Sequence, residues 1–521
     1  MKSILSSLLI ALAPLALSAQ SYQPGEPVDS VVPLTRNLHY SIEAQGSLSH
    51  GQTPLWLNAN KYGLSSLKET NGYLRASLIR PLEEASPRKW DIGYGLDIAV
   101  PANYTSNIVI QQAYGEVRWL HGLLTLGSKQ YPMELKNDRL SSGAQTLGIN
   151  ARPIPQLRLA LPQYWTLPIL GGWVQLKGHI AYGRMTDDKW QHHFTGRQHR
   201  YADDVNYHSK AGYLKIGNED RLFPWSVELG LEMASQFGGK SHSFATNGQE
   251  TVVKGEGGLK GAWHAFIPGG DSEGLDYGSN ASGNDLGSWL LRVNYDADEW
   301  AAHLYADHYF EDHSQMFMLD YDGYGSGNQW NSHRKHRYLL YELRDIMLGA
   351  ELNIKYGTWL RDVVVEYIYT KYQSGPIYHD HTRAISDHIS GIDNYYNHYL
   401  YPSWQHWGQV IGNPLYRSPI YNTDGQLDVR DNRFMAFHLG FDGRPVEQLD
   451  YRLLASWQVG YGTYDKPFNC TRHNLSLLLE AAYHFRHGWD LTGAYGMDIG
   501  SLLDHNQGFQ LTIKKSGILN L

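Results

Sequence analysis

The sequence predicts an all-β protein, a transmembrane antiparallel β-barrel of the outer membrane, and three observations predict it. Apolar and polar residues alternate along most of the chain, and a period of two places the two sets on opposite faces of a strand. The candidate strands run about eight to ten residues, which lets a tilted strand cross a bilayer. The chain has 37 tyrosines and 16 tryptophans but 13 phenylalanines, and aromatic rings with a polar tip suit a membrane interface.

Composition excludes several other classes of protein. Charged residues make up 18% of the 521 residues, below the roughly 25% of soluble domains, while a mean hydropathy of −0.45 is too polar for a helical membrane protein. The net charge of −8 gives no basic footprint for nucleic acid. The single cysteine, Cys470, rules out an intramolecular disulfide framework and a cysteine-rich zinc site.

The N-terminus is typical of an export signal. Lys2 is followed by an apolar run from Ile4 to Leu17 and by the small residues Ser18 and Ala19, the order of regions in a secretory signal peptide. We therefore expect residues 1–19 to be a cleaved signal peptide. Residues 20–521 would form a single outer-membrane β-barrel domain with long extracellular loops.

Residues 174–182 show the strand pattern most clearly, with Val174, Leu176 and Ile180 alternating with Lys177 and His179. A soluble β-sandwich alternates in the same way, so the choice of a barrel depends on the aromatic residues and on the connections. Connections come in two sizes, short turns and long polar loops, as in outer-membrane barrels. Aromatic residues crowd the strand ends: Trp90, Tyr94, Trp119, Trp173, Tyr182, Trp225, Trp300, Tyr367, Tyr369, Tyr483, Trp489 and Tyr495.

The number of strands is bounded by length. If a strand with its connection takes roughly 25 to 30 residues, the mature chain allows about 16 to 20 strands. A barrel of that width leaves an open aqueous lumen unless loops or helices fill it.

Three connections are too long for turns: about 186–208, 310–337 and 372–432, and a Gly/Ser/Asp-rich segment at 269–287 is a further candidate loop. They combine aromatic rings, on which a sugar ring packs, with Arg and Lys, which pair with acidic groups of a polymer. The predicted polysaccharide contacts are Trp190, His192, Arg197, Arg200, Tyr324, Trp330, Arg334, Lys335, Arg337, Tyr395, Tyr396, Trp404 and Trp407. The alternative interpretation is that these aromatic residues pack the loops together or lie at the membrane interface.

No motif indicates catalysis or a metal ion. His192-His193 and His379-Asp380-His381 lack the His-Glu-x-x-His spacing of a zinc helix. The chain has neither a Gly-x-Ser-x-Gly elbow nor a phosphate-binding glycine loop, and the carboxylates Asp203 and Asp204 are interpreted as solvated loop residues. We expect no enzyme activity, no metal and no cofactor, although a hydrolase that assembles Ser and His from separate strands stays open.

Several local sequences resemble the Wzi family of capsule-assembly outer-membrane proteins, in the form found in Bacteroidetes. The strongest match is residues 150–158 (NARPIPQLR), followed by 161–165 (LPQYW) and 178–183 (GHIAYG). Further matches span the chain, at 53–57, 60–63, 217–221, 236–239, 412–415, 418–422, 510–513 and 517–519. The chain departs from the usual barrel ending in one respect, since Leu521 stands where an aromatic residue is common.

This resemblance implies a monomeric barrel of about 18 strands whose lumen is occluded by loops and short helices. It also implies a lectin-like role, in which exterior loops hold capsular or other surface polysaccharide and support capsule assembly or attachment without chemistry. Outer-membrane lipid would be the other partner. Two other functions stay open: a general porin and an outer-membrane hydrolase acting on lipid or glycan.

Overall fold

The computed structural model describes residues 34–83, 89–218, 223–267, 283–311, 344–373 and 393–519. It also describes the backbone of four short strands, β15 (Gly323–Tyr324), β16 (His333–Arg334), β19 (Ile377–His379) and β20 (His388–Ser390). The predicted signal peptide and His381 lie outside the described residues. No helix within the described ranges is long and apolar enough to cross a membrane.

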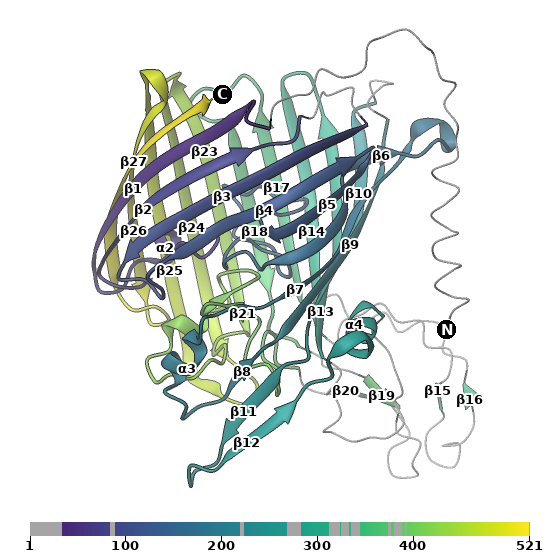
Figure 1. Cartoon of the computed structure of the whole chain (residues 1–521), viewed down its shortest axis with the longest axis vertical. Coiled ribbons are helices and arrows are strands. Elements are labelled where there is room, and N and C mark those ends of the chain that lie inside the picture. The colour runs from purple at the N-terminus through teal and green to yellow at the C-terminus, as the bar shows by residue number, and fades with distance from the viewer. Residues whose placement is uncertain are drawn as a thin grey trace.

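The chain forms a closed antiparallel barrel of 18 strands, in agreement with the expected number (Figure 1). Successive barrel strands are neighbours, and β27 pairs with β1 to close the sheet. Most barrel strands have 11 to 14 residues, more than the eight to ten predicted, because they continue past the exposed apolar belt. The strands are β1 (Leu38–His50), β2 (Thr70–Arg80), β3 (Trp90–Ala102), β4 (Val109–Trp119), β5 (Gly122–Ser128), β6 (Gln156–Thr166), β7 (Val174–Arg184), β9 (Asn206–Ile216), β10 (Trp225–Phe237), β13 (Asn284–Asp296), β14 (Trp300–Glu311), β17 (Ile346–Ile354), β18 (Asp362–Tyr369), β23 (Phe434–Val446), β24 (Leu449–Gly462), β25 (Pro467–Phe485), β26 (Trp489–Gly500) and β27 (Asn506–Leu519).

The two-residue period is confirmed by the two faces of the sheet. On β7, Ile180 is exposed on the outer face, whereas Lys177 and His179 bond inside the barrel to Glu134 and Ser209. Equivalent exposed apolar side chains encircle the barrel and include Ile42, Leu74, Leu96, Val117, Leu124, Leu159, Leu229, Leu291, Leu304, Leu348, Val365, Leu439, Leu479 and Leu511. An apolar outer belt of this kind faces hydrocarbon in transmembrane barrels.

One end of the barrel carries the short turns, and we call it the turn end. β27 finishes there, at the upper rim in Figure 1, and β4 and β5 are joined by Leu120 and His121. Five tryptophans at strand ends on this rim are between 41% and 62% exposed: Trp90, Trp119, Trp225, Trp300 and Trp489. The aromatic girdle predicted from the sequence is therefore present at this rim.

The opposite, loop end carries the long connections. The predicted connection 186–208 runs between β7 and β9 and contains α3 (Trp190–Thr195) and β8 (Tyr201–Asp203). The longest prediction, 372–432, corresponds to the connection between β18 and β23. Beyond the predictions, β11 (Lys240–Phe244) and β12 (Glu250–Lys254) form a hairpin that pairs with β8 and extends past the barrel (Figure 1). Helix α4 (Gly258–Phe266) follows the hairpin.

Three loop-end segments fill the lumen, residues 51–69, 129–155 and 393–433, and we call them the plug. Their buried side chains, such as Trp56, Leu140, Trp404 and Tyr416, share one apolar cluster with inward residues of the barrel wall. The wall residues in that cluster include Leu286, Tyr305, Val364, Phe434 and Leu454. The plug is mainly irregular chain with short regular elements: the helix α2 (Leu55–Asn58), the 3-10 turn η6 (Pro419–Tyr421) and the pair β21 (Gln405–His406) and β22 (Gln409–Val410). The barrel is thus occluded by loops and short helices, as expected.

Candidate functional site: the plug and the loop-end mouth

The plug is fastened to the wall by two buried carboxylates. Lys136 Nζ in the plug lies 2.8 Å from Asp307 Oδ2 on β14, and both side chains are 1% exposed. Glu366 on β18 accepts hydrogen bonds from the Ser141 hydroxyl (2.6 Å) and the Ser142 backbone N–H (2.8 Å). Since a buried charge is tolerated only when it is paired and hydrogen-bonded, these contacts fix the segment 129–155 in one position.

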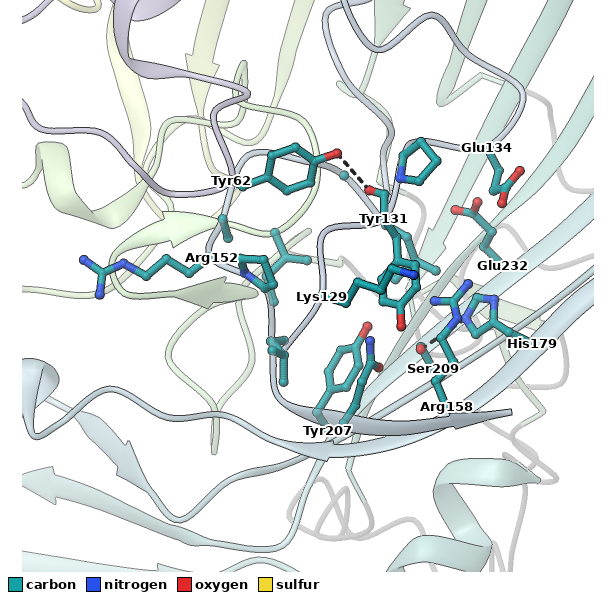
Figure 2. Close-up of a pocket in the computed structure, with 18 of the residues that line it drawn as sticks. Tyr62, Lys129, Tyr131, Glu134, Arg152, Arg158, His179, Tyr207, Ser209 and Glu232 are labelled. Carbon is teal, nitrogen blue, oxygen red and sulfur yellow. Dashed lines mark hydrogen bonds between the residues drawn. The ribbon is translucent and has the colours of Figure 1, made fainter. Parts of the chain in front are cut away.

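A small cavity lies between the plug and strands β6, β7, β9 and β10 (Figure 2). Apolar plug residues such as Leu147, Ile154 and Ile411 form part of its lining. The rest is aromatic and polar and includes Tyr62, Lys129, Tyr131, Arg158, His179, Tyr207, Ser209, Tyr213 and Glu232. The Arg158 guanidinium carbon lies 4.0 Å from the centre of the Tyr131 ring. Rings beside hydrogen-bond donors suit a polar ligand such as a sugar, but the plug covers this cavity from the loop end.

The same cavity holds one serine–histidine contact, which bears on the hydrolase alternative. His179 Nε2 lies 3.2 Å from Ser209 Oγ, although the two residues are 7% and 1% exposed. Among the described residues, no carboxylate forms a hydrogen bond with His179, so the third group that would orient a catalytic base is missing.

A second site lies at the mouth of the barrel, where the first and third predicted connections meet. Trp190 of α3 and Trp407 of the plug belong to one cluster with Phe194 and Ile420. Gly408 has a positive φ of 83°, and a Cβ at this position would lie 2.6 Å from the Trp190 ring. Glycine therefore lets the plug turn approach α3 closely.

Polar and cationic groups cover the outer side of this cluster. His192 Nε2 lies 2.7 Å from Asp203 Oδ1, and Arg197 Nη2 donates to His192 Nδ1 at 3.2 Å. Arg200 Nη1 donates to the backbone oxygen of Tyr399 at 2.8 Å. We call Trp190, His192, Arg197, Arg200, Tyr399 and Trp407 the mouth group. It joins an aromatic base to cations that face solvent.

The structure divides the predicted site residues into three sets. Trp190, His192, Arg197, Arg200 and Trp407 come together at the mouth. Tyr395, Tyr396 and Trp404 are completely buried in the plug, where Tyr395 donates to Asp345 (2.9 Å) and Trp404 Nε1 donates to the Thr146 carbonyl (3.2 Å). The alternative interpretation, that aromatic residues pack the loops, describes these three and also Trp190, which is 8% exposed and stacked on Phe194. The remaining predicted contacts lie outside the described residues, namely Trp330, Lys335 and Arg337 and the side chains of Tyr324 and Arg334.

Tyr399 was not among the predicted polysaccharide contacts, although it is 47% exposed beside Arg200.

The sequence carried a signal for the plug, because residues 394–416 contain no Asp, Glu, Lys or Arg. A stretch of that length without charge is unusual in an exterior loop and indicates burial. No group of three or more His, Cys, Asp or Glu side chains in the described ranges is arranged to hold a metal ion.

Comparisons with known proteins agree with the fold. A solved structure titled as Wzi, an outer-membrane protein involved in group 1 capsule assembly in Escherichia coli and a carbohydrate-binding β-barrel, matches with a TM-score of 0.53 at 12% identity. The match covers 92% of this chain and 85% of that one. The fold is that of an 18-stranded outer-membrane barrel.

Other solved barrels are less similar. Pseudomonas aeruginosa OccK2 matches with a TM-score of 0.45 at 9% identity over 93% of this chain and 98% of its own. OprD from the same organism matches with a TM-score of 0.42 at 8% identity over 93% and 95%. No protein-family model and no curated protein sequence matches the chain.

His406 connects its own plug segment to plug segment 129–155 and to the connection between β7 and β9. Its Nδ1 lies 2.8 Å from the Arg152 carbonyl, while Nε2 lies 2.6 Å from the Thr186 carbonyl and 3.2 Å from the Thr186 backbone nitrogen. Burial, together with the charge of Arg152, lowers the pKa of His406 to about 4. The neutral ring therefore forms this connection at neutral pH.

We expect the connection to weaken on acidification. Because the pKa is lower in the folded state, the unfolded state binds the extra proton, and the stabilisation is lost as pH falls from about 6.5 toward 4. Hydrogen exchange at residues 404–407 should accelerate over this range in the natural protein. The pH-dependent part should disappear in His406→Gln, and an identical pH response in both proteins would contradict the assignment.

Proposed function

We propose that this protein is an outer-membrane binder of acidic surface polysaccharide, with the mouth group as its contact surface. The observation that carries the proposal is the combination of a lumen filled by packed loops with a cationic, aromatic mouth above it. A filled lumen argues against bulk passage of solute. The exposed Tyr399 ring and the exposed Arg197 guanidinium are of the residue types that hold an acidic glycan.

The proposal extends to family and location. Similarity to the carbohydrate-binding barrel of E. coli in fold, together with the motifs at 150–158, supports membership of the Wzi family and a role in capsule assembly or attachment. In this account residues 1–19 direct export, the loop end faces the cell exterior, and the protein acts as a monomer without catalysis. The incomplete serine–histidine contact supports the non-catalytic part of the proposal.

Each cation of the mouth group has a distinct role in this proposal. Arg197 is exposed and presents its guanidinium to solvent, whereas Arg200 is half-buried and held by the Tyr399 carbonyl. A guanidinium binds a uronate carboxylate through paired N–H donors, and the exposed Tyr399 ring offers a surface for the sugar.

Binding is tested with the purified protein and surface polysaccharide extracted from the producing strain. Since a hydrogen bond to a charged group contributes about tenfold in affinity, Arg197→Ala should weaken binding by about tenfold. Tyr399→Ala removes the ring contact and should weaken binding by roughly three- to tenfold. Lys355→Gln is the matched control, because Lys355 is a turn-end cation paired with Asp296 at 2.5 Å. Equal affinity in all four proteins would remove the mouth group from the proposed site.

The role in the cell is tested by deleting the gene. The deletion should release capsule into the medium, complementation with the natural gene should restore retention, and Arg197→Ala/Tyr399→Ala should restore it only partly. Normal capsule retention in the deletion strain would reject the function while leaving the fold unaffected.

A further inference from the structure

A row of cations lies on the outer face of the barrel at the loop end, away from the mouth group. Tyr369 of β18 pairs with Met435 of β23, and two residues further on Lys371 lies opposite Arg433. Arg433 Nε donates to the Lys371 carbonyl at 3.1 Å, and the Tyr461 backbone N–H of β24 donates to the Arg433 carbonyl at 2.9 Å. The three residues therefore form one level across three adjacent strands.

The period of two places this level on the lipid side of the sheet. Val365 on β18, Phe437 on β23 and Trp457 on β24 are exposed on the outer face, and Lys371, Arg433 and Tyr461 follow them by even numbers of residues. The row therefore lies directly beyond the apolar belt, at the height where lipid head groups meet a barrel.

Each cation of the row is laid over a tyrosine ring. Lys371 Nζ lies 4.1 Å from the centre of the Tyr461 ring, and the Arg433 guanidinium carbon lies 3.7 Å from that of Tyr464. Arg344, which precedes β17, lies 4.7 Å from the Tyr372 ring. The Tyr464 hydroxyl donates to the Tyr372 backbone carbonyl at 2.6 Å, which holds the Tyr464 ring in place.

Within the described part of the chain, no carboxylate forms an ion pair with Lys371 or Arg433. Asp345 lies near enough to Arg433 for the guanidinium charge to act on the pKa of the Asp345 carboxyl. This carboxylate points inward, however, and accepts hydrogen bonds from the Tyr372 and Gln373 backbone and from Tyr395. Like charges opposite one another destabilise a sheet. Two adjacent cations that form no ion pair with a carboxylate of the described residues therefore favour an external anion.

Two cations near the turn end are paired with carboxylates. Arg444, on the same strand as Arg433, forms two hydrogen bonds with Asp450 at 2.5 and 2.8 Å, and Lys355 pairs with Asp296. Among the described residues, Lys371 and Arg433 therefore differ from Arg444 and Lys355 in having no carboxylate partner.

We propose that Lys371 and Arg433, backed by Tyr461 and Tyr464, bind the phosphorylated head group of a membrane lipid on the loop-end side. A phosphate monoester accepts several charge-assisted hydrogen bonds at once and matches two cations on neighbouring strands. Its acyl chains would lie on the apolar belt below the row. This lipid site is separate from the mouth group and does not depend on glycan binding.

The experiment measures binding of monophosphoryl lipid A to the full-length mature protein in detergent, by native mass spectrometry. The natural protein should bind this lipid at least about tenfold more tightly than the same lipid after enzymatic removal of its phosphate, and 0.5 M salt should weaken the binding. Lys371→Gln/Arg433→Gln should lose this preference, whereas Arg444→Gln should keep it.

Three results would overturn the proposal. One is equal binding of the phosphorylated and dephosphorylated lipids by the natural protein, a comparison that needs no variant to fold. Another is unchanged preference in the folded double variant, checked by the heat-dependent shift in gel migration typical of intact barrels. The third is displacement of the lipid by inorganic phosphate at equal concentration, which would indicate a site for free phosphate.

Discussion

Replacing Lys136 by alanine is expected to release the plug segment 129–155 from the barrel wall. In the natural protein Lys136 Nζ lies 2.8 Å from Asp307 Oδ2, and the substitution leaves this buried carboxylate without its cation. Removing one partner of a buried ion pair costs about 3–5 kcal/mol of stability. Hydrogen exchange in residues 129–155 should accelerate strongly, while the strands keep their protection. In planar bilayers the variant should show transient conductance steps.

A matched variant separates the buried charge from the loss of side-chain volume. Lys136→Met/Asp307→Asn removes both charges and keeps an acceptor for the Gln145 backbone N–H, which lies 3.1 Å from Asp307. This variant should recover most of the lost protection. Equal exchange in Lys136→Ala and the natural protein would show that the ion pair does not hold the plug.

Replacing Trp404 by alanine is expected to loosen the centre of the plug. The indole is completely buried, stacks 6.0 Å from Tyr207 of the wall and donates to the Thr146 carbonyl. Truncating a buried tryptophan costs about 3–5 kcal/mol. Exchange should accelerate in all three plug segments, because Trp404 belongs to the apolar cluster that they share.

Trp404→Phe is the control, because it keeps most of the ring and loses only the indole hydrogen bond and some volume. Its effect should be well below that of Trp404→Ala. If Trp404→Ala leaves exchange unchanged but abolishes glycan binding, Trp404 contacts the glycan, as its presence in the third long connection first indicated.

The barrel could be predicted from the sequence because its rules are local. On β7, Ile180 and Lys177 take opposite faces by the strand period alone, and Trp90 and Trp119 mark the rim because an indole has an apolar ring and a polar N–H. The face of each strand residue and the rim position of each tryptophan follow from the local sequence, so no long-range contact was needed to predict them.

The candidate site could be predicted only in part, because its members are placed by tertiary contacts. Trp404 and Trp407 lie three residues apart in one aromatic run, yet the first is buried against Tyr207 and the second packs with α3 at the mouth. Both are tryptophans in the same local sequence, so their different burial is decided by the turn at Gly408 and by contacts with residues far away in the chain. Anchors such as the pair Lys136–Asp307 join positions whose proximity only the closed barrel creates.

Planar-bilayer conductance of the purified natural protein tests most directly whether the plug fills the lumen. The plug predicts almost no steady current, with transient steps in Lys136→Ala. A stable conductance of the size expected for an open 18-stranded channel, in the natural protein without any substitution, would contradict the account and favour a porin.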